Sequence, residues 1–100
     1  MAISTEDRIF VEIKAYIDKA GVAYRSWYVG IAAESTRRLF DEHGVQKENG
    51  WWIFRTSSSA AEARRIEKRL LTIGCDGGGG GGDESTRAVY AYKKGAGTQP

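Results

Sequence analysis

Apolar side chains recur at helical spacing in two stretches of the chain. In residues 5–20 and 60–73 they fall three or four positions apart, as they do along one face of an α-helix. The two stripes consist of Ile9, Ile13, Ile17 and Ala20, and of Ala63, Ile66, Leu70 and Ile73. Ser59 and Glu62 form a capping-box pattern where the second stretch begins, and Gly74 follows its end. We therefore predict two amphipathic helices.

Three shorter runs have the pattern of β-strands. Residues 24–32 and 88–93 alternate between two kinds of side chain, as strands with two different faces do. One face carries Trp27, Val29 and Ile31 in the first run and Val89 and Ala91 in the last, and the other face carries Tyr28, Gly30, Tyr90 and Tyr92. Residues 51–55 are apolar on both faces, which predicts a strand that is covered on both. A short helix over residues 36–43, stopped by Gly44, is predicted between the first two strands.

Helices and strands therefore alternate along the chain, beginning with a helix. This order, with a first and a last strand that are each apolar on one face, predicts the α+β class. We expect a small three-stranded, mainly antiparallel sheet flanked by three helices. Residues 77–82 are six consecutive glycines, which lose too much backbone entropy on ordering to form regular structure. We therefore predict a flexible loop over residues 76–84, and a single domain over residues 1–100 with a frayed tail from residue 95.

Composition excludes several classes of protein. Fifteen basic and thirteen acidic residues give a net charge of +2, which by itself does not indicate a nucleic-acid partner. No apolar run approaches the roughly 20 residues that a membrane helix needs. One cysteine and one histidine rule out an internal disulfide and a Cys/His zinc site. Because the N-terminus also lacks the basic and apolar regions of a signal peptide, we expect a cytoplasmic protein with no membrane partner.

Four motifs, in order, resemble the GIY-YIG nuclease superfamily. Tyr28-Val29-Gly30-Ile31 is similar to the family's Tyr-Ile-Gly strand, and Arg37-Arg38-Leu39 with His43 resembles the helix that follows it. Trp52-Ile53-Phe54-Arg55 is similar to the third strand of the family. The run from Glu62 to Leu70 resembles the helix whose glutamate holds a metal ion. The resemblance spans residues 26–74, about half of the chain.

The chain departs from the family pattern in three places. Ala32 stands where the family has threonine, and the spacing from Arg38 to His43 is one residue longer than expected. No Gly-Ile-Tyr strand precedes Tyr28, where this chain has a helix instead. These departures leave open a catalytically inactive relative that serves as a nucleic-acid-binding or protein-interaction module.

The last predicted strand offers a replacement for the missing one. Ala88-Val89-Tyr90 has the small, aliphatic and tyrosine order of Gly-Ile-Tyr. We predict that this strand lies antiparallel beside residues 26–32, as a circular permutation would place it. Tyr90 or Tyr92 would then sit across from Tyr28, on the face where Glu67 and Arg38 converge.

The resemblance implies metal-assisted phosphodiester hydrolysis. A tyrosine would help to deprotonate the attacking water, an arginine would offset the phosphate charge, and a glutamate would bind one Mg²⁺. The candidate catalytic residues are Tyr28, Arg38, His43, Glu67 and Tyr90, with Glu67 as the metal ligand. Each also has a structural reading, such as an ordinary strand tyrosine for Tyr28 or an ion pair with Glu42 for Arg38.

The implied partner is nucleic acid, and DNA is the expected kind. The candidate phosphate contacts are the basic residues Arg37, Arg64, Arg65, Lys68 and Arg69. Four of them share the polar side of the third helix, which could equally be a solvated face.

Overall fold

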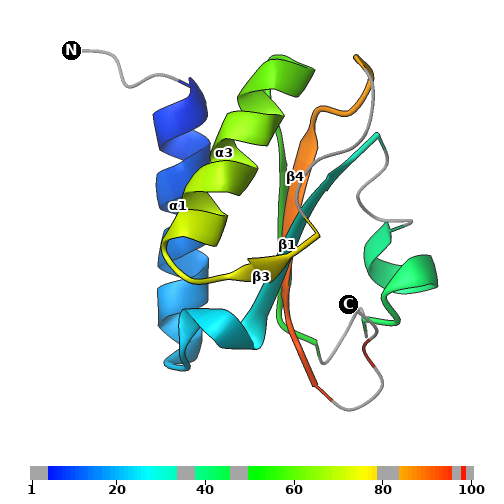
Figure 1. Cartoon of the computed structure of the whole chain (residues 1–100). Helices are drawn as coiled ribbons and strands as arrows, with labels where there is room; N and C mark the ends of the chain where they lie inside the picture. The colour runs from blue at the N-terminus through cyan, green and yellow to red at the C-terminus, as the bar shows by residue number, and fades with distance from the viewer. Residues whose placement is uncertain (1–4, 34–37, 46–49, 79–83, 96–97, 99–100) are drawn as a thin grey trace.

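The chain folds into a β-sheet with helices packed on both of its faces (Figure 1). The computed structural model describes residues 5–33, 38–45, 50–78, 84–95 and 98. Helices α1 (Thr5–Ala20) and α3 (Ala60–Thr72) cover one face of the sheet, and the short π-helix η2 (Arg38–Glu42) lies over the other. The predicted α+β class is confirmed. Within the described ranges, no helix has the length and apolar character that a membrane crossing requires.

The sheet has four strands, in the order β2-β4-β1-β3. They are β1 (Trp27–Ala32), β2 (Trp52–Thr56), β3 (Asp76–Gly77) and β4 (Ala88–Lys93). Strand β4 lies between β1 and β2 and is antiparallel to both, whereas β3 is parallel to β1. The prediction of a three-stranded, mainly antiparallel sheet is therefore wrong in the number of strands, because β3 adds a fourth, parallel strand beside β1.

Strand β3 also corrects the predicted loop, since its two residues fall inside the 76–84 range. The chain turns at Gly74, whose φ is +123°, and runs back beside β1. A Cβ on Gly77 would lie 2.7 Å from the carbonyl oxygen of Val29 and 2.9 Å from Leu71 Cδ2. The absence of a side chain at Gly77 is therefore what lets β3 approach β1 this closely. Residues 79–83, the rest of the glycine run, lie outside the described ranges.

The main core lies between the two long helices and the sheet. It contains the predicted stripes of α1 and α3 together with Trp27, Val29, Ile53, Val89 and Ala91. The first half of the predicted capping box is confirmed, since Ser59 Oγ accepts a hydrogen bond from the Glu62 amide at 3.1 Å. The carboxylate of Glu62 accepts from the amide of Ser58, the residue before the N-cap, at 3.0 Å. The first strand is shorter than predicted, because Tyr24–Ser26 form a 3₁₀ turn before β1.

Strand β2 is an edge strand, not the covered strand that its two apolar faces predicted. Trp51, just before it, remains 37% exposed. Two outward-pointing backbone groups are nevertheless bonded to side chains: the Trp52 amide donates to Tyr16 Oη at 3.2 Å, and the Phe54 carbonyl accepts from Arg55 Nη1 at 2.8 Å. These contacts shield part of an edge that would otherwise be open to pairing.

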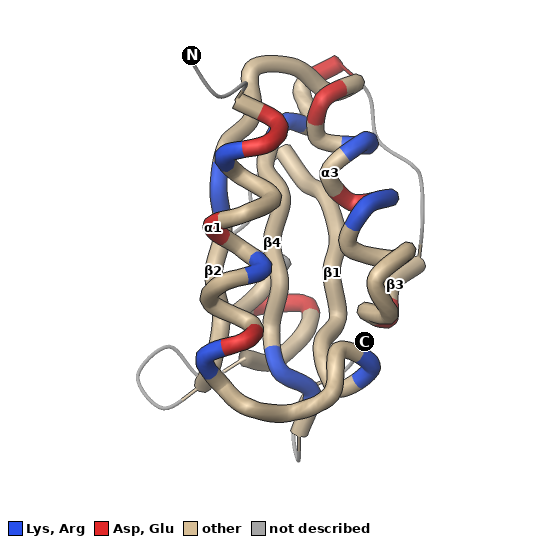
Figure 2. The backbone as a smooth tube through the Cα atoms, turned by 90° about the vertical axis from the view of Figure 1, so that its left-hand side faces the viewer, with Lys and Arg blue, Asp and Glu red and all other residues tan. Residues whose placement is uncertain are grey.

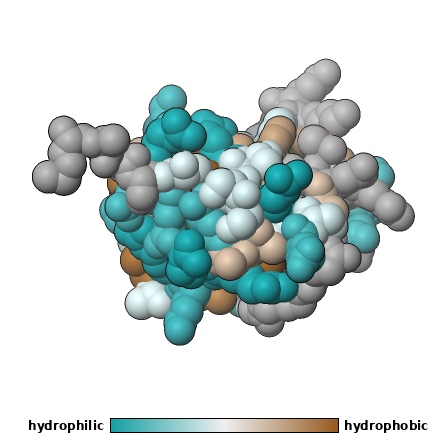
Figure 3. Space-filling model, turned by 90° about the horizontal axis from the view of Figure 1, so that it is seen from above, coloured by the Kyte–Doolittle hydropathy of each residue, from teal (hydrophilic) through white to brown (hydrophobic). Residues whose placement is uncertain are grey.

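The end of the molecule drawn in Figure 3 carries mainly hydrophilic side chains where it is described.

Candidate functional site: a tyrosine–histidine cluster

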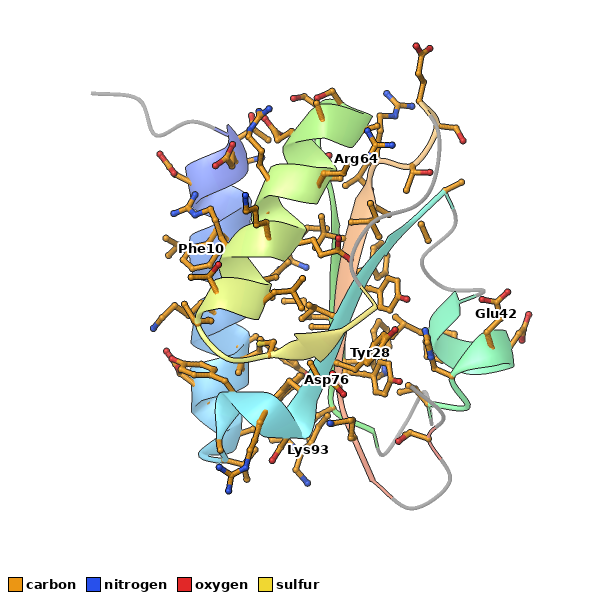
Figure 4. The ribbon with its side chains drawn as sticks, viewed as in Figure 1. Phe10, Tyr28, Glu42, Arg64, Asp76 and Lys93 are labelled. Atoms are coloured by element: carbon orange, nitrogen blue, oxygen red, sulfur yellow. The ribbon has the colours of Figure 1, made fainter. Side chains whose placement is uncertain are left out.

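Three tyrosines and the histidine meet on the face of the sheet opposite α1 and α3. Tyr28 comes from β1, Tyr90 and Tyr92 come from β4, and His43 follows η2. The strand register places Tyr28 across from Tyr92 and Gly30 across from Tyr90. The predicted antiparallel pairing of the last strand with β1 is therefore confirmed. Figure 4 shows Tyr28 on the side of the sheet that faces η2.

His43 is hydrogen-bonded through both of its ring nitrogens. Its Nε2 lies 2.9 Å from Tyr90 Oη, and its Nδ1 lies 3.2 Å from Tyr92 Oη. The imidazole ring also packs against Tyr28 with the ring centroids 5.1 Å apart. Tyr90, Tyr92 and His43 are buried, whereas Tyr28 is only half-buried. Tyr28 is therefore the aromatic ring of the cluster that solvent or a ligand can reach.

Local sequence explains how these groups come together. Alternation along β4 puts Tyr90 and Tyr92 on one face, and the main core takes Val89 and Ala91 on the other. Leu39 is fully buried in a second, smaller core on the tyrosine face and so anchors η2 there. The helix predicted over 36–43 appears as the turn Arg38–Glu42, with Gly44 beyond it at a φ of +69°. His43, which directly follows η2, is thereby placed against the tyrosines.

Gly30 makes room for Tyr90. A Cβ built on Gly30 would lie 2.6 Å from Tyr90 Cζ and closer still to its hydroxyl. Real Cβ atoms do not approach other heavy atoms this closely, so the Tyr90 ring occupies the space that any side chain at position 30 would need. The glycine of the Tyr-Val-Gly motif is therefore part of the site.

Burial sets the protonation state of Tyr92. Loss of solvent raises the pKa of Tyr92 well above the usual range for a phenol, and the neighbouring Tyr28 and Tyr90 raise it further. At neutral pH Tyr92 therefore keeps its proton. Sequence reasoning noticed Tyr92 only as an alternative to Tyr90. The signal for including both was their two-residue spacing on one face of a strand.

One of the predicted catalytic residues does not join the cluster, and the side chain of another lies outside the described residues. Glu67 is buried on α3, which packs against the opposite face of the sheet beside Val29. The expectation that Glu67 shares the tyrosine face is therefore not met, because the helix that carries this glutamate packs with the main core on the opposite face of the sheet. Arg38 begins η2, but its side chain and all of Arg37 lie outside the described residues.

A magnesium site is not built at the cluster by the described residues. They contain no group of three or more His, Cys, Asp or Glu side chains placed to hold a metal ion. One carboxylate can suffice for Mg²⁺ when phosphate and water supply the remaining ligands. However, Glu67 is on the wrong side of the sheet to serve the tyrosines. The position of the helix that carries Glu67, and not the number of ligands, is what disagrees with the implied metal.

The basic side of α3 is partly neutralised by α1. Arg65 Nε donates to Glu6 Oε1 at 2.6 Å, and Arg69 Nη1 contacts both Glu6 Oε2 at 3.2 Å and Asp7 Oδ1 at 2.8 Å. The hydrogen bond from Arg65 lowers the pKa of Glu6, which therefore stays ionised at neutral pH. In Figure 2, acidic positions lie in the first turn of α1 and basic positions lie along α3. Two of the predicted phosphate contacts, Arg65 and Arg69, thus already have acidic partners on α1, and the side chains of Arg64 and Lys68 are exposed.

Comparisons with family models, with curated proteins and with solved structures found no match. A function is therefore proposed from the contacts and burial of the tyrosine–histidine cluster.

Proposed function

We propose that this chain is a GIY-YIG-like domain in which the C-terminal strand replaces the missing N-terminal one, and that it acts on nucleic acid by phosphodiester hydrolysis. One observation carries the proposal. Strand β4 lies antiparallel beside β1 and brings Tyr90 to within hydrogen-bond distance of His43, next to Tyr28. Two tyrosines and a histidine are among the groups that the resemblance implies for such a site, together with an arginine and a glutamate.

The chemistry of the cluster suits proton transfer. A tyrosine must lose its proton before it can take one from an attacking water, and it does so more readily where a hydrogen-bond donor stabilises the phenolate. His43 stands 2.9 Å from Tyr90 Oη and can supply that donor. Half-buried Tyr28 is in a position to meet the substrate. Because Glu67 lies on the opposite face, no step is assigned to a metal ion.

Cleavage assays test this proposal directly. Purified protein is incubated with plasmid, linear and branched DNA, each with Mg²⁺ and with EDTA. We expect Tyr28→Phe and Tyr90→Phe to reduce the rate by roughly 10²-fold or more, the range for removal of a general acid or base. Tyr24→Phe is the matched control, because its hydroxyl bonds Asp18 at 2.6 Å away from the cluster. Equal cleavage by all variants would assign the activity to another site or to a contaminant.

A second candidate is a catalytically inactive module that binds nucleic acid or a protein. The observation that favours it is burial: Tyr90 is 2% exposed and Tyr92 is fully buried, which restricts the access of a substrate to these two side chains. Intact DNA at high protein concentration, with measurable binding, would favour this candidate over the nuclease.

The α1–α3 ion pairs lead to a prediction about binding under either candidate. We expect Glu6→Gln to strengthen DNA binding, because it removes the ion pair with Arg65 and one of the two ion pairs of Arg69. Each new phosphate contact should steepen the log–log salt dependence by about 0.9 on duplex DNA. Affinity is measured by fluorescence anisotropy across a salt series. Glu12→Gln, which frees Arg55 at the sheet edge, is the matched control and should leave the slope unchanged. A common slope for both variants would remove this face of α3 from the binding surface.

A further inference from the structure

We infer that Tyr92 is a positioning residue that fixes the tautomer of His43. By donating its hydroxyl proton to Nδ1, Tyr92 leaves the imidazole proton on Nε2, where His43 donates it to the oxygen of Tyr90. The part assigned to Tyr90 rests on the proposed function, whereas the tautomer itself can be measured without it.

The first step concerns the direction of the Tyr92 hydrogen bond. Tyr92 is fully buried, and in the described part of the chain its hydroxyl has one hydrogen-bond partner, His43 Nδ1 at 3.2 Å. A buried hydroxyl that does not donate leaves a polar hydrogen unsatisfied, which is unfavourable. The raised pKa of Tyr92 agrees that the proton stays on its oxygen. Tyr92 is therefore the donor and Nδ1 the acceptor.

The second step follows from imidazole chemistry. A neutral imidazole has one N–H donor and one acceptor nitrogen, so a ring that accepts at Nδ1 carries its proton on Nε2. Nε2 faces Tyr90 Oη at 2.9 Å, and the N–H must therefore point at that oxygen. Among the described residues, the titratable groups near His43 include the three tyrosines whose rings pack against it and, on η2, exposed Asp41 and Glu42.

The third step separates the roles of the two buried tyrosines. An oxygen that accepts an N–H hydrogen bond is better able to carry negative charge than a hydroxyl whose proton is engaged as a donor. Tyr90 Oη is therefore the oxygen of the pair that is better placed to carry negative charge. Tyr92 is the orienting group for His43. As in other histidine sites, the hydrogen bond to one ring nitrogen decides whether the other nitrogen carries a proton.

The test uses the fact that the chain contains one histidine. In tag-free protein labelled with ¹⁵N-histidine, long-range ¹H–¹⁵N spectra at pH 8 report the tautomer of His43 alone. We expect the Nε2–H form in the wild type and in Tyr90→Phe, which keeps the Tyr92 donor. In Tyr92→Phe the ratio of the two tautomers should move roughly tenfold towards Nδ1–H, as expected for the loss of one hydrogen bond.

The outcomes separate this inference from the proposed function. An Nδ1–H ring in the wild type, or an unchanged ratio in Tyr92→Phe, overturns the inference even if DNA is cleaved. The expected tautomers in a protein that leaves DNA intact support the inference and contradict nuclease activity. If Tyr92→Phe does not fold, the wild-type and Tyr90→Phe spectra still decide, because Nδ1–H in either one contradicts the assigned donor.

Discussion

Replacing Gly30 by alanine is expected to displace Tyr90 and to dismantle the cluster. The new Cβ would lie 2.6 Å from Tyr90 Cζ, so the Tyr90 ring, which is 2% exposed, would have to shift within the core. Overpacking of this kind typically lowers the free energy of unfolding by about 1–3 kcal/mol. The backbone of Gly30 is not in the left-handed region, so the effect comes from the side-chain clash alone. Urea unfolding measures the stability, and the His43 nitrogen shifts report the loss of the Tyr90 contact.

Two further variants make this test specific. Gly95→Ala is the matched control, since a Cβ at Gly95 meets nothing within 4 Å, and its stability should stay near the wild-type value. Adding Tyr90→Phe to Gly30→Ala removes the atom nearest the new Cβ and should restore part of the lost stability. A Gly30→Ala protein with normal stability and normal His43 shifts would show that the ring has another place to go.

Truncating Leu39 to alanine is expected to remove the cover from the tyrosines. Leu39 is fully buried, and the loss of such a side chain costs about 2–5 kcal/mol of unfolding free energy. The helix η2 has only five residues, so it depends on this anchor more than a long helix would. Release of η2 should expose Tyr92 and His43 to solvent. Tyr92 should then titrate at a lower pH than in the wild type, because its burial is what raises its pKa.

Ile13→Ala provides the comparison for Leu39→Ala. Ile13 is also fully buried, but it belongs to the main core on the other face of the sheet. Both variants should lose a similar amount of stability by urea unfolding. Only Leu39→Ala should change the tyrosine titration followed by ultraviolet absorbance. A change of equal size in both would mean that the two cores melt as one unit, and that η2 has no separate role in shielding the cluster.

Features that depend on local sequence could be predicted. Helix α1 and strand β4 have the predicted bounds, because the spacing of their apolar residues and the alternation of Tyr90 and Tyr92 decide both structure and facing. The pairing of β4 with β1 was also predictable, since Ala88-Val89-Tyr90 matched the strand that the motif order lacked. That step used the resemblance in addition to the periodicity.

Features that depend on distant contacts could not be predicted. Strand β3 exists because Gly77 fits between Val29 and Leu71, and two residues carry no periodic signal. The pairing of Arg65 with Glu6 joins positions 59 residues apart, so α3 alone suggested a free basic face. The helical period places Glu67 at the edge of the apolar stripe of α3. It does not indicate which face of the sheet α3 covers.

The central position of β4 has a consequence for how the domain is made. Among the described strands, β4 is the one that joins β2 to β1, and it is the last of the four to leave the ribosome. Until residues 88–93 emerge, the nascent chain has two helices but no continuous sheet, and the inner edges of β1 and β2 have no partner. Such edges and the apolar residues around them are prone to pairing with other chains. During synthesis, this domain is therefore prone to aggregation until β4 inserts between β1 and β2.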